Sequence, residues 1–110
     1  MKIAMPTAEG RLCRHFGHCE RFAIVTADED GNLTCEEVEP PPHEPGALPR
    51  WLRNQGVDVV IASGMGRRAQ MFFEQFGIRV IVGAEPDDPL RVARAFLDGT
   101  LTVGPNVCDH

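Results

Sequence analysis

Two thiols and two imidazoles lie close together near the N-terminus of this 110-residue chain. They belong to Cys13, His15, His18 and Cys19, and Arg14 stands among them. Thiolate sulfur and imidazole nitrogen are the ligands that zinc, copper and iron–sulfur species prefer, and an arginine stabilises an anion through charge-assisted hydrogen bonds. A lone histidine or cysteine would be interpreted as structural. The cluster instead favours a ligand-binding site, and we predict one here.

A glycine-rich turn in the middle of the chain is the second candidate binding segment. Its glycines let the backbone approach a ligand closely, and the N–H groups at the start of the helix that follows favour negative charge. The turn lacks the Gly-Lys-Ser/Thr of a Walker motif, and its Gly-x-Gly does not complete a dinucleotide fingerprint. Met65 either contacts the ligand or packs in the core. The residues predicted to bind a cofactor here are Ser63, Gly64, Met65, Gly66, Arg67 and Arg68.

The C-terminal residues Cys108 and His110 are two further candidate metal ligands. A Cys-x-His at a chain terminus can bind a metal, and it can equally be a frayed end. Both interpretations stay open for this segment, and residues 100–110 are expected to form a flexible tail of a single domain.

The pattern of apolar residues predicts an α/β fold. Short strands are expected at residues 2–6, 21–28 and 33–39, with a tight turn between the last two, and the apolar runs 57–62 and 79–82 are typical of buried parallel strands. Helices are expected at residues 47–55, at residues around 69–76 and from Pro89 to near Gly99. This order favours a three-layer α/β/α sandwich around a mixed sheet of about five strands. The proline-rich segment 40–45 connects the two halves of the domain.

Three connections are expected to share one edge of this sheet. Ligands of open α/β sheets collect beyond the carboxyl ends of parallel strands. If the topology is right, the long loop 7–20, the turn 63–66 and the segment 83–85 all leave the sheet on that side. The two candidate binding segments would then lie together.

Composition excludes several classes of protein. The net charge of −5 disfavours non-specific binding to nucleic acid. The sequence has no run of about 18 apolar residues, so no membrane span is expected, and the N-terminus has no signal-peptide pattern. We therefore expect a cytoplasmic protein with reduced cysteines.

Together these segments resemble the dinitrogenase iron–molybdenum cofactor biosynthesis family, which includes nitrogenase accessory carriers and the orange protein. The His-Phe-Gly-His-Cys segment combined with the Gly-x-Gly-Arg-Arg-Ala turn is fairly specific for it. The matching segments are spread over essentially the whole chain, at residues 1–6, 15–22, 64–69 with 72–73, 77–80 and 83–84.

The resemblance implies a ribonuclease H-like α/β fold in which one strand of the mixed sheet is antiparallel. It also implies non-covalent binding of an anionic metal–sulfur cluster that contains iron, molybdenum or both, or molybdenum with copper. Such proteins act as carriers or scaffolds and not as enzymes, and their partners would be cofactor-assembly or recipient metalloproteins. Cluster handling would fall on His15, His18 and Cys19 and on the turn Gly64–Arg68.

Two alternatives remain open on the residues alone. The first is a zinc or copper sensor or store that uses Cys13, His15, His18 and Cys19, although their tight spacing makes tetrahedral ligation by all four difficult. The second is an enzyme. A nuclease of this fold needs carboxylates at strand ends to hold magnesium, but the first strand has none and the central strand offers only Asp58, at its start. We therefore expect no catalytic residues.

Overall fold

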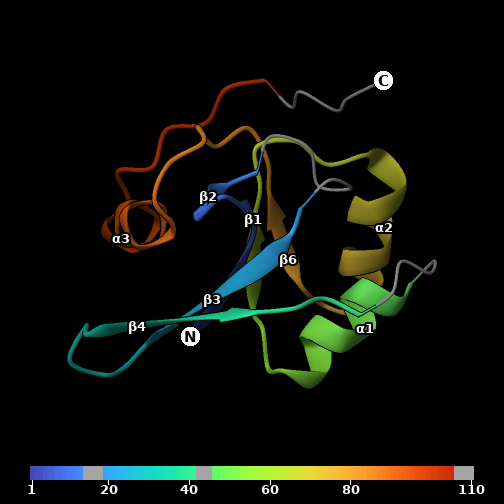
Figure 1. Cartoon of the computed structure of the whole chain (residues 1–110), viewed down its shortest axis with the longest axis horizontal. Helices are drawn as coiled ribbons and strands as arrows, with labels where there is room; N and C mark the ends of the chain where they lie inside the picture. The colour runs from blue at the N-terminus through green and yellow to red at the C-terminus, as the bar shows by residue number, and fades with distance from the viewer. Residues whose placement is uncertain (14–18, 42–45, 106–110) are drawn as a thin grey trace.

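The computed structural model describes residues 1–13, 19–41 and 46–105, and it contains a six-stranded sheet in the order β4-β3-β1-β5-β6, with β2 paired to the end of β1 (Figure 1). The strands are β1 (Lys2–Ala8), β2 (Arg11–Leu12), β3 (Arg21–Ala27), β4 (Leu33–Val38), β5 (Val59–Ile61) and β6 (Arg79–Ile81). β1 pairs antiparallel with β3 and parallel with β5, and β5 pairs parallel with β6. β3 is also antiparallel to β4. Among the five strands in the order given above, β3 alone therefore runs in the direction opposite to the other four. The expected mixed sheet is confirmed, with one antiparallel strand among these five and the short β2 as a second strand antiparallel to β1.

The sheet has six strands where the sequence predicted about five, because the predicted loop 7–20 contains a small hairpin. β1 continues past Pro6 to Ala8, and β2 folds back against it, with Thr7 opposite Leu12. Pro6 does not end the strand, because its carbonyl still accepts a hydrogen bond from the Cys13 N–H at 2.8 Å. Glu9 and Gly10 make the reversal with positive φ angles of 55° and 78°, as tight hairpin turns require. A two-residue strand carries no periodic signal, so the sequence did not reveal it.

Helices cover both faces of the sheet, which confirms the three layers. The helices are α1 (Ala47–Asn54), α2 (Arg67–Gln75) and α3 (Pro89–Asp98). α1 and α2 lie on one face and α3 on the other (Figure 1). β1 serves both layers because successive side chains point to opposite faces: Ala4 packs with Leu52 and Phe73 under α1 and α2, whereas Ile3 and Met5 pack under α3.

The ends of α3 follow the predicted capping pattern. The Asp88 carboxylate accepts a hydrogen bond from the Leu90 N–H at 2.8 Å, and Pro89 occupies the first helical position. Gly99 ends the helix in the left-handed conformation, with φ 75°, where a side chain would be strained. In the parts of the chain that the structure describes, no helix is long and apolar enough to cross a membrane.

The described part of the C-terminal segment docks on the sheet. Val103 forms an antiparallel bridge with Ala84, and the Gly104 N–H donates to the Gly83 carbonyl at 2.7 Å. Residues 102–105, which we call the C-terminal strap, therefore lie beside the connection that leaves β6. The predicted ligands Cys108 and His110 fall outside the described residues.

Candidate functional site

The carboxyl ends of β1, β5 and β6 meet at one edge of the sheet, at the top of the view in Figure 1. Hydrogen bonds join the connections that leave these strands. The Gly83 N–H donates to the Ser63 carbonyl at 3.0 Å, and the Leu12 N–H donates to the Asp87 carbonyl at 3.0 Å. The described parts of the three connections thus form one continuous rim, which we call the carboxyl rim.

The first connection is fixed at both ends of its undescribed part. Before that part, the Cys13 N–H donates to the Pro6 carbonyl, and after it the Glu20 N–H donates to the Thr7 carbonyl at 2.8 Å. The Glu20 carboxylate also accepts a hydrogen bond from the Glu9 N–H at 3.1 Å. Three predicted site residues of this connection, Arg14, His15 and His18, lie outside the described residues. Cys19 is the predicted site residue of this connection that the structure describes.

Cys19 occupies a sheltered position at the rim. Its side chain is partly buried and packs against the core cluster under α1 and α2. Burial, together with the nearby Cys13 thiolate, raises the pKa of the Cys19 thiol from 9.0 to about 11. Both causes disfavour the charged form in a setting with little water. Cys19 is therefore a protonated thiol at neutral pH, and a metal that binds it must displace the proton.

The second connection splits into a buried half and an exposed half. Ser63, Gly64 and Met65 are buried, whereas Gly66 and the two arginines that follow are exposed. The Ser63 hydroxyl donates to the Ala84 carbonyl, and the Gln70 side-chain amide donates to the Met65 carbonyl at 2.9 Å. Met65 itself is fully buried in the core cluster under α1 and α2. The serine hydroxyl and the methionine side chain thus hold the turn in place.

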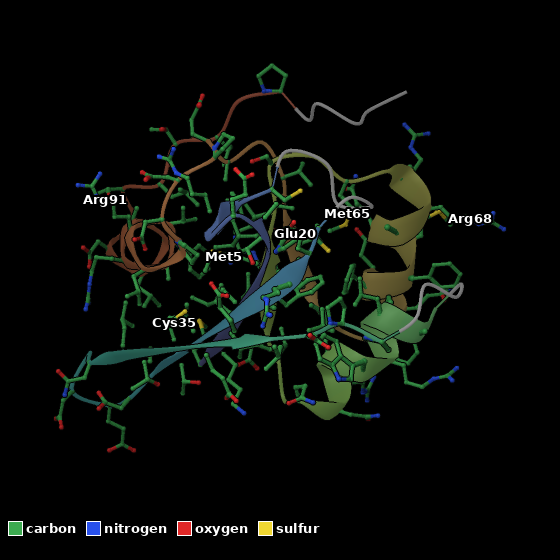
Figure 2. The ribbon with its side chains drawn as sticks, viewed as in Figure 1. Met5, Glu20, Cys35, Met65, Arg68 and Arg91 are labelled. Atoms are coloured by element: carbon green, nitrogen blue, oxygen red, sulfur yellow. The ribbon has the colours of Figure 1, made fainter. Side chains whose placement is uncertain are left out.

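The exposed half forms the N-terminus of α2. Gly66 provides no side chain to cap the helix, and the first turn contains no acidic residue. Arg67 and Arg68 instead add positive charge to the positive end of the helix dipole. Figure 2 shows the Arg68 side chain pointing away from the sheet and from Met65. An anion would be favoured at this terminus, with Arg68 approaching it only from the outer side of α2.

The other two arginines near the first connection are engaged with carboxylates. Arg11 lies 3.9 Å from Asp87, and Arg21 lies 4.0 Å from Glu39. Both pairs are exposed and therefore weak. Each still reduces the positive charge that the arginine offers to a ligand, so among the described residues the α2 terminus is the stronger candidate for an anion site.

Sequence reasoning did not find the part of the rim that the strap builds. A cavity of about 180 Å³ lies beside Ser63 and is walled by the β6 connection and the strap; its lining residues are Ser63, Gly83, Ala84, Glu85, Pro86, Gly104 and Pro105. The only signal in the sequence was the pair of glycines. A Cβ on Gly83 would lie 2.0 Å from the Gly104 carbonyl oxygen, so the close approach of the two backbones requires glycine.

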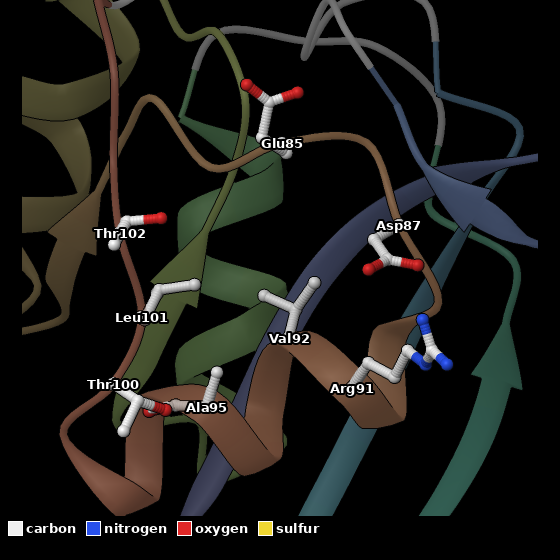
Figure 3. A pocket seen from close by; sticks show the side chains of 8 residues that line it. All are labelled: Glu85, Asp87, Arg91, Val92, Ala95, Thr100, Leu101 and Thr102. Carbon is white, nitrogen blue, oxygen red and sulfur yellow. Dashed lines mark hydrogen bonds between the residues drawn. The ribbon is translucent and has the colours of Figure 1, made fainter.

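A second hollow, of about 260 Å³, lies between α3 and residues 100–102, which lead into the strap, and was also not predicted. Val92, Ala95 and Leu101 form its apolar side, and Glu85, Asp87 and Arg91 stand at its mouth (Figure 3). Its carboxylates do not suit an anion. Within residues 1–13, 19–41 and 46–105, no group of three or more His, Cys, Asp and Glu side chains is placed to hold a metal ion.

Comparison with known proteins decides the family. Residues 1–99 match the family model described as dinitrogenase iron–molybdenum cofactor. The chain belongs to this family. As a family member it is 37% identical, over 86 residues, to an uncharacterized protein of Methanocaldococcus jannaschii, covering 73% of this chain and 72% of the relative.

Solved structures agree with the family assignment and with the fold. The crystal structure of the protein PH0822 is 31% identical, with a TM-score of 0.84 and 94% of each chain covered. The apo form of the orange protein from Desulfovibrio gigas is 22% identical, with a TM-score of 0.73, covering 96% of this chain and 93% of that one. At that identity the orange protein shows a shared fold alone.

Proposed function

We propose that this member of the iron–molybdenum cofactor family binds and carries an anionic metal–sulfur cluster as an accessory or delivery protein. The cluster would contain molybdenum, iron or both, with or without copper. The chain would act as a carrier and not as a catalyst, in the cytoplasm, and would exchange the cluster with cofactor-assembly or recipient metalloproteins. Family membership supports this class of role, and the chemistry of the carboxyl rim supports an anionic cargo.

The observation that carries the proposal is the uncapped, arginine-bearing N-terminus of α2 at the carboxyl rim. Each cation in the first turn of a helix costs roughly 0.3–1 kcal/mol of helix stability when nothing offsets it. Arg67 and Arg68 are both placed there, and neither has an acidic neighbour in that turn. A bound polyanion would reverse the sign of this interaction, because it would lie against backbone N–H groups and guanidinium groups together.

The predicted direct ligands come from two segments far apart in the sequence. Cys19 lies at the rim on the first connection, and His15 and His18 precede it in the sequence. Pro105 lines the cavity beside Ser63, and Cys108 and His110 follow it in the sequence. Both lie outside the described residues and stay proposed ligands.

Loading with a preassembled anion tests the proposal. Reduced protein incubated anaerobically with tetrathiomolybdate, with or without iron or copper, should retain a coloured complex of fixed stoichiometry after gel filtration. The double variant Arg67→Gln/Arg68→Gln should lose most of this retention. The control variant Arg50→Gln/Arg91→Gln removes the same charge from exposed positions on α1 and α3 and should retain the complex. Equal loss in both variants, or a colourless wild-type protein, would refute the proposal.

The zinc or copper sensor that the sequence left open is tested by the same preparation. Metal analysis of protein purified without added metal would reveal stoichiometric zinc, with no molybdenum or iron, if that alternative were correct. Two of its four proposed ligands, His15 and His18, lie outside the described residues, so the alternative stays a prediction.

A further inference from the structure

The strand β4 is an edge of the sheet, and within residues 1–13, 19–41 and 46–105 no strand pairs with its outer side (Figure 1). Its inner side pairs with β3 over six consecutive residues, without a bulge. The strand contains no proline, and its four central residues are exposed. Of the devices that commonly protect a sheet edge, this strand therefore shows only charge.

The hydrogen bonds of β3 determine which backbone groups of β4 point outward. Ala27 both donates to Met1 and accepts from it, so the backbone of Ala27 faces β1. Bonded pairs alternate along antiparallel strands, so the backbone of Thr26 faces β4, where Thr34 lies opposite. The same alternation along β4 turns the N–H and C=O groups of Cys35, and of every second residue from it, away from the sheet.

The hairpin of β3 and β4 carries the acidic charge of the protein. Residues 28–39 contain six Asp and Glu and no Lys or Arg, so this segment alone accounts for the net charge of −5. On β4 itself, Glu36 and Glu37 are exposed, and as neighbours in a strand they point to opposite faces of the sheet. A strand added at this edge would therefore meet a carboxylate on each of its faces.

Charge complementarity selects the strand that can be added. A second copy of β4 would place glutamates beside glutamates, and like charges on neighbouring strands destabilise their pairing. A basic strand would form opposite-charge pairs with Glu36 and Glu37, and its backbone would bond to the outward N–H and C=O groups, as in other complexes formed by strand addition. The acidic edge thus repels its own copies and stays open to a basic segment.

We propose that the outer edge of β4 binds an extended segment of a partner protein that carries lysine or arginine, by strand addition. The segment lies beside β4, with its backbone bonded to the outward groups of Cys35 and Glu37. β3 and β1 separate β4 from β5 and β6, so the docking edge is distinct from the α2 terminus and from the cavity beside Ser63. The inference goes beyond cluster carriage and does not depend on it.

The test uses the full-length, reduced protein and the synthetic peptide acetyl-Thr-Val-Lys-Lys-Val-Thr-amide, with a control peptide that has glutamate in place of both lysines. Amide hydrogen exchange followed by NMR should slow at Cys35 and Glu37 when the lysine peptide binds. It should stay unchanged at Glu36, whose N–H already faces β3. The glutamate peptide should protect neither amide. Absence of protection by the lysine peptide, or equal protection by both peptides, would overturn the proposal.

Charge variants test the role of the two glutamates. Glu36→Gln/Glu37→Gln should weaken binding of the lysine peptide by about tenfold, because opposite-charge pairs across neighbouring strands stabilise their pairing. The control Glu74→Gln/Asp98→Asn removes the same charge from exposed positions on α2 and α3 and should bind the peptide like wild type. Equal weakening in both variants would show an effect of net charge alone and would contradict a site on β4.

A backbone variant separates strand addition from attraction to the carboxylates. Cys35 lies on β4 with an exposed thiol (Figure 2), and Cys35→Pro removes one outward N–H at a position where an edge strand tolerates proline. The variant keeps both glutamates and should fail to bind the lysine peptide, with urea denaturation as the check on folding. If it does not fold, a lysine peptide methylated on its backbone nitrogens replaces it and should fail to bind the wild-type protein.

Two outcomes would assign the edge differently. Binding retained by folded Cys35→Pro, or by the methylated peptide, would mean that the carboxylates alone hold the peptide and would refute strand addition. Concentration-dependent dimerisation that protects the Cys35 and Glu37 amides without any peptide would assign the edge to a second copy of the chain and would equally refute the proposal.

Discussion

Cys19 is the residue where packing and chemistry conflict most clearly. It lies against an apolar cluster, near a second thiol, and yet it borders the edge at which a ligand is expected. This environment stabilises the neutral thiol relative to the charged thiolate. Cys19 therefore stays a protonated thiol, and only a bound metal or a high pH would remove its proton.

The raised pKa of Cys19 predicts a loss of stability in alkaline solution. The thiol titrates at 9.0 when unperturbed and at about 11 in the folded protein, so the unfolded chain releases this proton first. Its stabilising contribution is fully present below pH 9 and declines as pH rises toward 11. Urea denaturation of the metal-free protein between pH 8 and 11 should show wild-type stability falling more steeply than that of Cys19→Ala. Parallel pH profiles would contradict the assignment.

At the scale of elements, the connection after β6 shows how a backbone contact shapes the rim. Gly83 and Gly104 approach so closely that neither a side chain nor a water molecule fits between them. This contact holds the strap against the connection and closes the cavity beside Ser63. Glycine is required at residue 83 by the contact with Gly104, twenty-one residues away, as well as by the positive φ of its own turn.

Substitution of Gly83 by alanine should therefore cost more than substitution of a comparable glycine. Gly77 has a similar φ of 74°, but a Cβ there would meet nothing within 4 Å. Both variants suffer the left-handed strain of roughly 1–2 kcal/mol, and Gly83→Ala must in addition displace the strap. Chemical denaturation should find Gly83→Ala the less stable of the two. Equal losses would mean that the strap contributes nothing to folding.

For the whole molecule, the sheet brings distant segments to one edge of a chain whose net charge is −5. Acidic side chains line the exposed strand β4 at residues 36 and 37, whereas the arginines of α2 stand at the rim. An anionic cargo is thus favoured locally by a protein that repels anions as a whole. If the proposed cargo binds at the rim, its affinity should depend on the rim being complete.

Two truncations test how far the C-terminal segment completes the rim. A chain that ends at Pro105 keeps the strap and loses Cys108 and His110, whereas a chain that ends at Leu101 loses both. If the strap is needed as a wall of the cavity beside Ser63, tetrathiomolybdate retention should fall sharply only in the chain that ends at Leu101. If the terminal ligands are needed, retention should fall already in the chain that ends at Pro105. Retention by both at the wild-type level would exclude any role for the segment. Thermal denaturation should accompany each measurement, since the shorter chain also loses the Val103 bridge.

The sequence alone determined the layers, the order of the long strands along the chain and the family. Buried runs such as residues 57–62 and the helical spacing of Phe72, Phe73 and Phe76 are local patterns, so each element could be predicted from its own residues. The ends of α3 were equally local, because Asp88 and Gly99 cap the helix through their immediate neighbours. The candidate anion site at α2 was predictable for the same reason.

Only the tertiary structure decided which atoms meet at the rim. The pairing of β2 with β1, the contact of Gly83 with Gly104 and the packing of Cys19 against the core cluster under α1 and α2 all join residues whose spacing along the chain carries no periodic signal. Such contacts depend on the path of the chain through the whole sheet, and the free energy that selects them comes from burying surfaces contributed by several elements at once. For that reason the composition of the candidate site could be read from the sequence, whereas its walls and the environment of its thiols could not.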